Sequence, residues 1–187
     1  AGWAYRHLDA DEDWTAVTIP HDAMLYEPRH ALAASGLNSG WFEGRDYEYV
    51  KHFMPERDMV GSRMLLEFEG VYHHAEVWVN GEKAAFRPYG YTNFYVDLTG
   101  RVRFGEDNEI RVIARNADQP NSRWYSGAGI YRPVTLWTSP AEHIAVDGLF
   151  VRTIAADPAN GTARIRVEVE TTAAGSVHIE IADMAGG

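Results

Sequence analysis

The stretch AEVWVNGEKAAF, residues 75–86, consists of two strand-like runs joined by Asn80-Gly81. Both central positions of a two-residue hairpin turn need positive φ, which Asn and Gly tolerate best. Similar runs, rich in β-branched and aromatic residues, recur at 63–71, 93–99, 108–117 and 132–139. The best helix candidate, 26–36, is short and contains a proline. Many short strands separated by turn signals predict an all-β fold, either a sandwich, a jelly roll or a barrel.

The character of the strands changes near Ser139, where a linker-like stretch leads into a second group of strands. We predict strands at 163–172 and 176–183, because apolar and polar residues alternate there, and a further strand at 148–156. An immunoglobulin-like sandwich needs about seven strands. The sequence therefore predicts a jelly-roll domain at 1–140, followed by a truncated immunoglobulin-like β-sandwich at 141–187. With half of its strands present, the second unit is expected to be disordered, to pair with a second copy or to lie against the first.

Composition and charge exclude several classes of function. The 187 residues include 27 Asp and Glu but only 17 Lys and Arg, a net charge of −10, whereas nucleic-acid binding needs a basic face. No apolar run is long enough to span a membrane. The chain contains no cysteine, which removes disulfides and thiolate metal sites. Together with the lack of a recognisable signal peptide, this favours a cytoplasmic bacterial protein over a secreted one.

Two stretches, one acidic and one with adjacent histidines, do not fit the pattern of a metal site. The run DADED at 9–13 begins like a calcium loop, but the positions that need Gly and Glu hold Trp14 and Pro20. His73 and His74 are adjacent, and neighbours in a strand point to opposite faces, so they cannot share one ion. We therefore expect no metal and no cofactor.

Glu67 and Glu69 are the best carboxylate pair for acid–base chemistry. They lie on one face of a predicted strand, and glycosidase carboxylates stand about 5 to 9.5 Å apart. Glu-x-Glu is also ordinary on the wet face of a sandwich, so no catalytic role is assigned. Residue chemistry alone indicates an acidic all-β domain with aromatic-rich loops, compatible with sugar binding because sugar CH groups stack on aromatic rings.

Three longer stretches occur in a fixed order. They are WTAVTIPHDAML at 14–25, LEFEGVYHHAEVWVNGEKAAFRPYGYTNFYVDLT at 66–99 and NSRWYSGAGIYRPVTL at 121–136. Together they resemble the N-terminal region of glycoside hydrolase family 2, which includes β-galactosidases, β-glucuronidases and β-mannosidases. The resemblance extends from residue 14 to residue 139.

This resemblance implies a jelly-roll sugar-binding domain followed by the start of an immunoglobulin-like module. In the family, the nucleophile and the acid/base glutamate lie in a later (β/α)₈ barrel, which is absent here, so the chain alone should be inactive. The implied parent is a retaining enzyme, β-galactosidase-like, or else a β-glucuronidase or β-mannosidase type. The implied partners are a carbohydrate and the missing barrel, and homo-oligomers are left open.

The closing motif supplies two of the candidate substrate-binding residues. Six positions before Gly129, where relatives often carry an Asp that contacts the sugar, this chain has Arg123. An Arg could donate paired hydrogen bonds to sugar hydroxyls, bind a barrel carboxylate or simply brace the interface. Trp124 or Tyr125 could form an apolar wall of the sugar site or pack between domains. Gly127 and Gly129 are expected to allow either a bulge or positive φ where the loop turns into the last strand.

The early motif supplies the other two candidates, His21 and Asp22. They occupy a loop that resembles one near the active site of relatives, although Ala23 stands where the family often has Trp. Two other classes of function remain. A free-standing carbohydrate-binding module would bind sugar without a barrel. A structural or adhesive sandwich would hold Arg123, Trp124 and Asp22 far apart.

Overall fold

The computed structural model describes residues 2–182. The chain divides into two compact units, Ala1–Thr138 and Ser139–Gly187.

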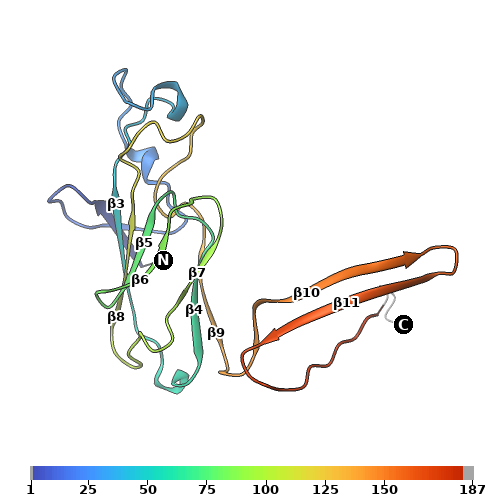
Figure 1. The fold of residues 1–187 in the computed structure, drawn as a ribbon. Helices are drawn as coiled ribbons and strands as arrows, with labels where there is room; N and C mark the ends of the chain where they lie inside the picture. Colours follow the sequence, from blue (N-terminus) through green and yellow to red (C-terminus); the bar gives the residue numbers. More distant parts are fainter. Residues whose placement is uncertain (1, 183–187) are drawn as a thin grey trace. The chain divides into compact units, whose positions relative to one another are not determined.

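The first unit is a β-sandwich of two sheets (Figure 1). The larger sheet has the order β2-β1-β3-β8-β5-β6 and is antiparallel. Its strands are β1 (Trp3–His7), β2 (Thr15–Val17), β3 (Tyr47–Phe53), β5 (Ala75–Val79), β6 (Glu82–Arg87) and β8 (Asn108–Ala114). The smaller sheet has the order β7-β4-β9 and is made of β4 (Arg63–Phe68), β7 (Phe94–Asp97) and β9 (Val134–Ser139). The predicted all-β sandwich is confirmed.

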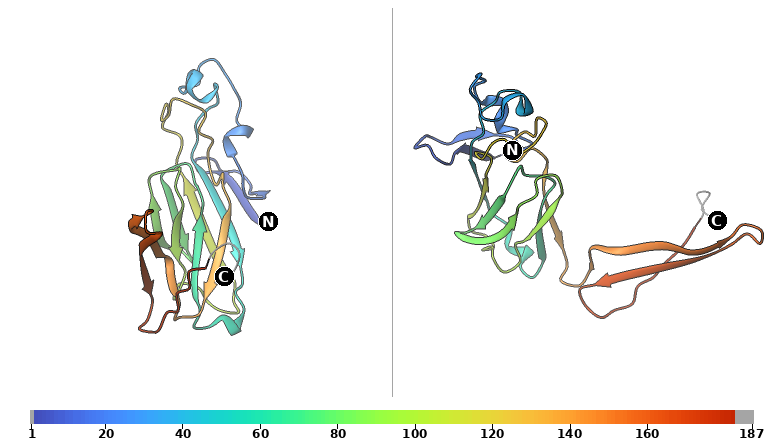
Figure 2. Two further views of the ribbon diagram at one scale, coloured as in Figure 1. Left: turned by 90° about the vertical axis from the view of Figure 1, so that its right-hand side faces the viewer. Right: turned by 45° about the horizontal axis from the view of Figure 1, so that its top comes forward.

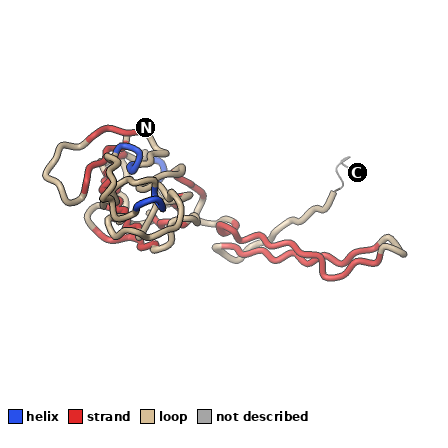
Figure 3. Tube along the Cα trace, turned by 90° about the horizontal axis from the view of Figure 1, so that it is seen from above, coloured by secondary structure: helices blue, strands red, loops and turns tan. Residues whose placement is uncertain are grey.

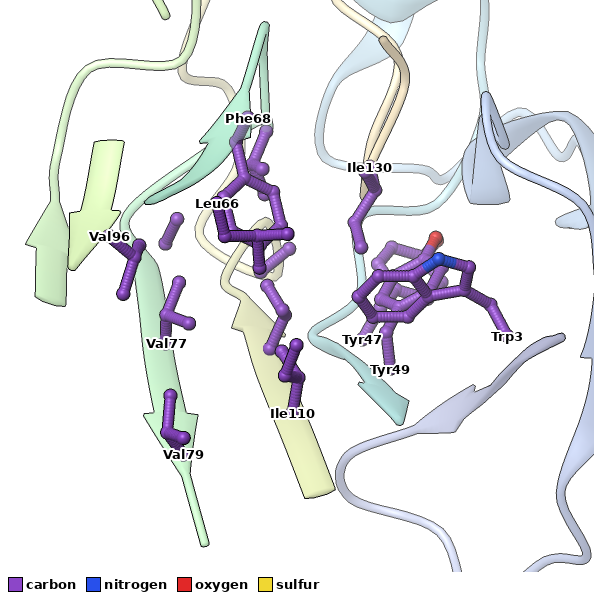
Figure 4. Close-up of a cluster of buried hydrophobic side chains, with 14 of the residues drawn as sticks. Trp3, Tyr47, Tyr49, Leu66, Phe68, Val77, Val79, Val96, Ile110 and Ile130 are labelled. Atoms are coloured by element: carbon purple, nitrogen blue, oxygen red, sulfur yellow. The ribbon is translucent and has the colours of Figure 1, made fainter. Parts of the chain in front are cut away.

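The core lies between these two sheets and follows the alternation of the strands. In β4 the buried residues are Met64, Leu66 and Phe68, whereas the residues between them are half-exposed. Figure 4 shows side chains of the two sheets meeting in this space. Phe68 stacks on Phe94 with ring centroids 5.1 Å apart. The alternation of buried and half-exposed residues along the strands therefore explains why the two sheets pack face to face.

The hairpin predicted at Asn80-Gly81 is present. β5 pairs with β6 through Val79 and Glu82, and the two turn residues have φ of 50° and 84°. The Asn80 side chain also accepts a hydrogen bond from the backbone N–H of Glu109 at 3.0 Å. This turn residue thus fixes the hairpin to the neighbouring strand β8.

The helical segments of the described residues are three short 3₁₀ turns (Figure 3). They are η1 (Ala23–Tyr26), η2 (Gly36–Ser39) and η3 (Arg57–Met59). The candidate stretch 26–36 does not form a helix, since Pro28 disfavours the helical conformation of the preceding Glu27, which is extended at φ −77° and ψ 149°. Within residues 2–182, no helix is long and apolar enough to cross a bilayer.

The second unit contains one antiparallel hairpin. β10 (Ile144–Asp157) pairs with β11 (Thr162–Thr171), and the turn between them uses Gly161 at φ 63°. The third strand, predicted over 176–183, is wrong over its described part, 176–182, which is irregular; residue 183 lies outside the described residues. Alternation can mark a face for burial, but a strand also needs a hydrogen-bonding neighbour, and Val177, Ile179 and Ile181 stay exposed.

Candidate functional site

Two loops that carry the family-like motifs meet at one end of the first unit. The early loop carries His21 and Asp22, the closing loop carries Arg123 and Trp124, and the two together are the end loops. Figures 1 and 2 show the early loop, in blue, beside the closing loop, in yellow to tan. The backbone N–H of His21 donates to the carbonyl of Ile130 at 2.8 Å, and that of Ala23 donates to the carbonyl of Ala128 at 3.0 Å. Segments more than a hundred residues apart are thereby joined as a short backbone ladder.

Asp22 bridges these two loops with its carboxylate. Oδ1 accepts the backbone N–H groups of Met24 at 3.2 Å and Ala128 at 3.0 Å, so Asp22 caps the N-terminus of η1. Oδ2 accepts the hydroxyl of Tyr125 at 2.7 Å. Burial and the Asp22 charge both raise the pKa of Tyr125, which therefore stays a hydrogen-bond donor. Gly127 has φ +70° and sits against the same carboxylate, 2.8 Å from Oδ2 to the position a Cβ would take.

His21 is buried beneath this bridge. Its Nδ1 lies 2.9 Å from the hydroxyl of Tyr49, and its ring stacks on Tyr26 with centroids 5.2 Å apart. Burial lowers the pKa of His21, against a weaker opposing effect of the Asp22 charge. With 7 % of its surface exposed, His21 acts as a support for the loop more than as an open hydrogen-bonding group.

Arg123 and Trp124 project outward from the closing loop. Trp124 is 58 % exposed, and its indole N–H donates to the hydroxyl of Tyr91 at 2.8 Å. The hydrogen bond at the indole N–H thus fixes the orientation of the ring, and much of the ring stays exposed. Arg123 is exposed and makes no hydrogen bond or ion pair within residues 2–182. Of the four predicted residues, the structure fixes His21 and Asp22 internally and leaves Arg123 and Trp124 available.

Beside Trp124 lies a cleft of about 590 Å³ with a mostly aromatic lining. The lining residues are Tyr72, His73, His74, Pro88, Tyr89, Gly90, Tyr91, Asn121, Ser122 and Trp124. Apart from Trp124, none of these residues is predicted from the sequence as a site residue. The sequence features that point to this cleft are the aromatic run YGY at 89–91 and, further along the chain, the loop at 121–132, which is rich in Arg, Trp and Tyr. Its convergence with residues 72–74 depends on strand order, which composition does not reveal.

Asn121 organises the inner wall of this cleft. Its Oδ1 accepts the hydroxyl of Tyr72 at 3.1 Å, and its Nδ2 lies 3.0 Å from Nε2 of His73. Because Nδ2 is a donor, Nε2 must be the unprotonated, accepting nitrogen of His73. Burial, followed by the charge of His74, lowers the pKa of His73 to about 4. The cleft therefore contains a neutral imidazole near neutral pH.

Protonation of His73 is expected to destabilise the first unit at acid pH. The folded-state pKa of about 4 lies below the usual value of 6.5, so between these values the unfolded chain binds a proton that the folded chain does not. The free energy of unfolding should fall as the pH drops from 6.5 towards 4, and this group should have no effect above that window. Urea unfolding at pH 7 and pH 4.5 should show a smaller loss for His73→Gln. An equal loss in both proteins would contradict this.

The described residues offer binding groups at this end, and the surroundings of Glu67 do not suit a general acid. Glu67 accepts hydrogen bonds from Asn93 at 3.0 Å and from Trp137 at 2.7 Å, and these bonds lower its pKa, whereas a general acid needs a raised one. Within residues 2–182, no group of three or more His, Asp or Glu side chains is arranged to hold a metal ion. The arrangement can bind and orient a ligand.

Comparison with known proteins identifies the family. The model of the glycosyl hydrolase 2 galactose-binding domain-like family matches residues 3–157. The chain belongs to glycoside hydrolase family 2. The three motifs that predicted this family are all inside the matched region.

Among the relatives of this chain, β-galactosidase BoGH2A of Bacteroides ovatus is 39% identical over 148 residues, which are 79% of this chain and 17% of the relative. A putative β-glucuronidase of Formosa agariphila is 30% identical over 165 residues, 88% of this chain and 16% of the relative. The crystal structure of a β-glycosidase from Bacteroides vulgatus superposes with a TM-score of 0.80 at 30% identity, covering 91% of this chain and 23% of that one. The chain thus spans less than a quarter of each of these relatives.

Proposed function

We propose that this chain is the N-terminal, non-catalytic part of a retaining β-glycosidase, β-galactosidase-like, in which the end loops complete a sugar site above a barrel domain. The Asp22–Tyr125 hydrogen bond carries this proposal. It joins the early and closing family motifs at one end and leaves the exposed Arg123 and Trp124 directed outward beside the aromatic cleft. The β-galactosidase and β-glucuronidase relatives support the reaction class.

In this proposal the chain positions the substrate, and the barrel performs the chemistry. A retaining glycosidase needs two carboxyl groups, one as nucleophile and one as acid/base, about 5 to 5.5 Å apart. The end loops instead supply an aromatic face from Trp124 and hydrogen-bond donors from Arg123. Asp22 and His21 hold these groups in position through Tyr125 and Tyr49. The direct test is hydrolysis of p-nitrophenyl β-D-galactoside by the full-length protein, with the 187-residue chain inactive.

A β-glucuronidase parent is the second candidate, and the free guanidinium of Arg123 is the observation that favours it. A guanidinium without an internal carboxylate partner can bind the carboxylate of a uronic acid with two parallel hydrogen bonds. Comparing kcat/KM for p-nitrophenyl β-D-galactoside and β-D-glucuronide distinguishes the two parents. A free-standing carbohydrate-binding module is a further alternative, and it would be favoured if the isolated chain bound galactosides through Trp124.

Arg123→Ala in the full-length protein should lower kcat/KM by about ten-fold or more, since each tenfold corresponds to about 1.4 kcal/mol of transition-state stabilisation. The matched control is Arg164→Ala, which removes the same charge from an exposed position in β11. Unchanged kinetics in Arg123→Ala would leave this residue as an interface brace and remove it from the sugar site.

A further inference from the structure

The outer face of the smaller sheet presents an ordered aromatic and polar surface that the end loops do not use. Burial of Met64, Leu66 and Phe68 directs Glu67 to the opposite side of β4. On β7, Tyr95 is paired in register with Glu67. On the other side of β4, strand β9 contributes Trp137. Three neighbouring strands thus place a carboxylate between two aromatic rings.

Trp137 is exposed but held in one orientation. Its side chain is 54 % exposed, and its indole N–H donates to Oε2 of Glu67 at 2.7 Å. The other carboxylate oxygen accepts from Asn93 at 3.0 Å. The hydrogen bond from Asn93, and to a lesser extent that from Trp137, lowers the pKa of Glu67, so the carboxylate that holds Trp137 remains ionised. A fixed ring whose face is open gives contact area at little cost in side-chain entropy.

Glu67, which accepts the indole N–H of Trp137, also lines a hollow of about 450 Å³. The other lining residues are Glu69, Tyr91, Thr92, Asn93 and Arg132. The side chains of Glu69 and Arg132 share the hollow, yet neither makes a hydrogen bond or ion pair within the described part of the chain. An acceptor and a donor of opposite charge therefore remain open to a ligand that lies between them.

The position of Arg132 is set by packing. Its guanidinium lies over the ring of Tyr131, 5.5 Å from the centroid, and Tyr131 is itself held by a hydrogen bond to the carbonyl of Gly90 at 2.8 Å. The stem of Arg132 passes close to Gly70, where a Cβ would lie 3.0 Å from its Cδ. Packing against Tyr131 and Gly70 thus fixes the guanidinium of Arg132, while its N–H groups make no hydrogen bond within the described residues.

The chemistry of this surface selects a sugar ring over other ligands. A pyranose has an apolar CH face that stacks on an indole ring, and hydroxyls that both donate to carboxylates and accept from guanidinium and amide groups. The two carboxylates oppose phosphate or other anions, and Arg132 opposes a bare cation. A purely apolar partner would leave these charges desolvated without compensation.

We propose that the hollow lined by Glu69 and Arg132, together with Trp137, binds a pyranose ring of a neutral oligosaccharide. This surface is separate from the residues of the end loops, although Tyr91 lines both the hollow and the aromatic cleft. The proposal does not rest on the proposed function, because it concerns binding by the chain itself.

The test is a nuclear magnetic resonance titration of the 187-residue chain with lactose and with cellotetraose. The expected result is a shift of the Trp137 indole N–H signal with a Kd on the order of 1 mM, a binding free energy of about −4 kcal/mol. Glu69→Gln and Trp137→Ala should each weaken binding about ten-fold, and Trp137→Phe less, because it retains an aromatic face. The backbone spectrum of each variant verifies its fold.

Trp14→Ala is the matched control, since it removes an exposed Trp that lines neither the hollow nor the aromatic cleft. Trp124→Ala distinguishes this surface from the end-loop site. Binding that persists in Trp124→Ala and weakens in Glu69→Gln supports the site on the smaller sheet. No shift with either sugar at 50-fold excess over the expected Kd of about 1 mM overturns the proposal. Loss of binding only in Trp124→Ala also overturns it and moves the sugar to the aromatic cleft.

Discussion

Replacing Gly129 with alanine is expected to lower the free energy of unfolding of the first unit by about 3 kcal/mol or more, from backbone strain and overpacking together. Gly129 has φ +83°, and a Cβ there would overlap the hydroxyl of Tyr49 and lie 2.9 Å from its Cζ. Tyr49 is fully buried and cannot move without disturbing the core. Because its hydroxyl also contacts His21, the damage should reach the early loop.

The matched control is Gly100→Ala. Gly100 has nearly the same backbone angle, φ +76°, but no atom lies within 4 Å of its Cβ position. Its substitution should therefore show the backbone strain alone, about 1 to 2 kcal/mol. Urea unfolding of both variants separates strain from overlap. Equal losses would mean that Tyr49 shifts freely and that the closing loop is not locked against the core.

These glycines illustrate how much of the fold a single sequence can predict. Either a bulge or positive φ was predicted for Gly127 and Gly129 from the need to turn a loop into a strand, and both residues have positive φ. The groups that crowd them, Asp22 and Tyr49, come from other parts of the chain. Local conformation follows from residue type, but long-range contacts depend on which strands become neighbours.

The same distinction explains why the strand predicted at 176–183 was wrong over its described part and why the aromatic cleft was not predicted. The irregular stretch 176–182 has the alternation of a strand but no neighbour to complete its backbone hydrogen bonds. The aromatic cleft joins residues 72–74 to residues 89–91 and 121–124. Its separate pieces were visible only as family motifs. A period-two pattern specifies which side of a strand is buried, and it does not specify which loops will share one end of the sandwich.

Removing the carboxylate of Asp22 is the second change with a large expected effect. Asp22→Ala leaves two backbone N–H groups and the hydroxyl of Tyr125 without their acceptor. Hydrogen bonds to a charged group contribute about 1.5 to 3 kcal/mol each, and water replaces part of that where the site is open. We therefore expect the free energy of unfolding to fall by about 3 kcal/mol. Asp22→Asn should lose less, because one oxygen remains as an acceptor.

Tyr125→Phe isolates the contact between the two loops. It removes only the 2.7 Å hydrogen bond to Asp22 and should lower the free energy of unfolding by about 1 to 1.5 kcal/mol. If the carboxylate is the bridge, adding Tyr125→Phe to Asp22→Ala should have little further effect, which a double-mutant cycle measures. Full additivity would instead mean that the loops are held by the backbone ladder between 21–23 and 128–130. In that case Asp22 would be free to turn towards a ligand, and its direct contact with substrate would become the stronger interpretation.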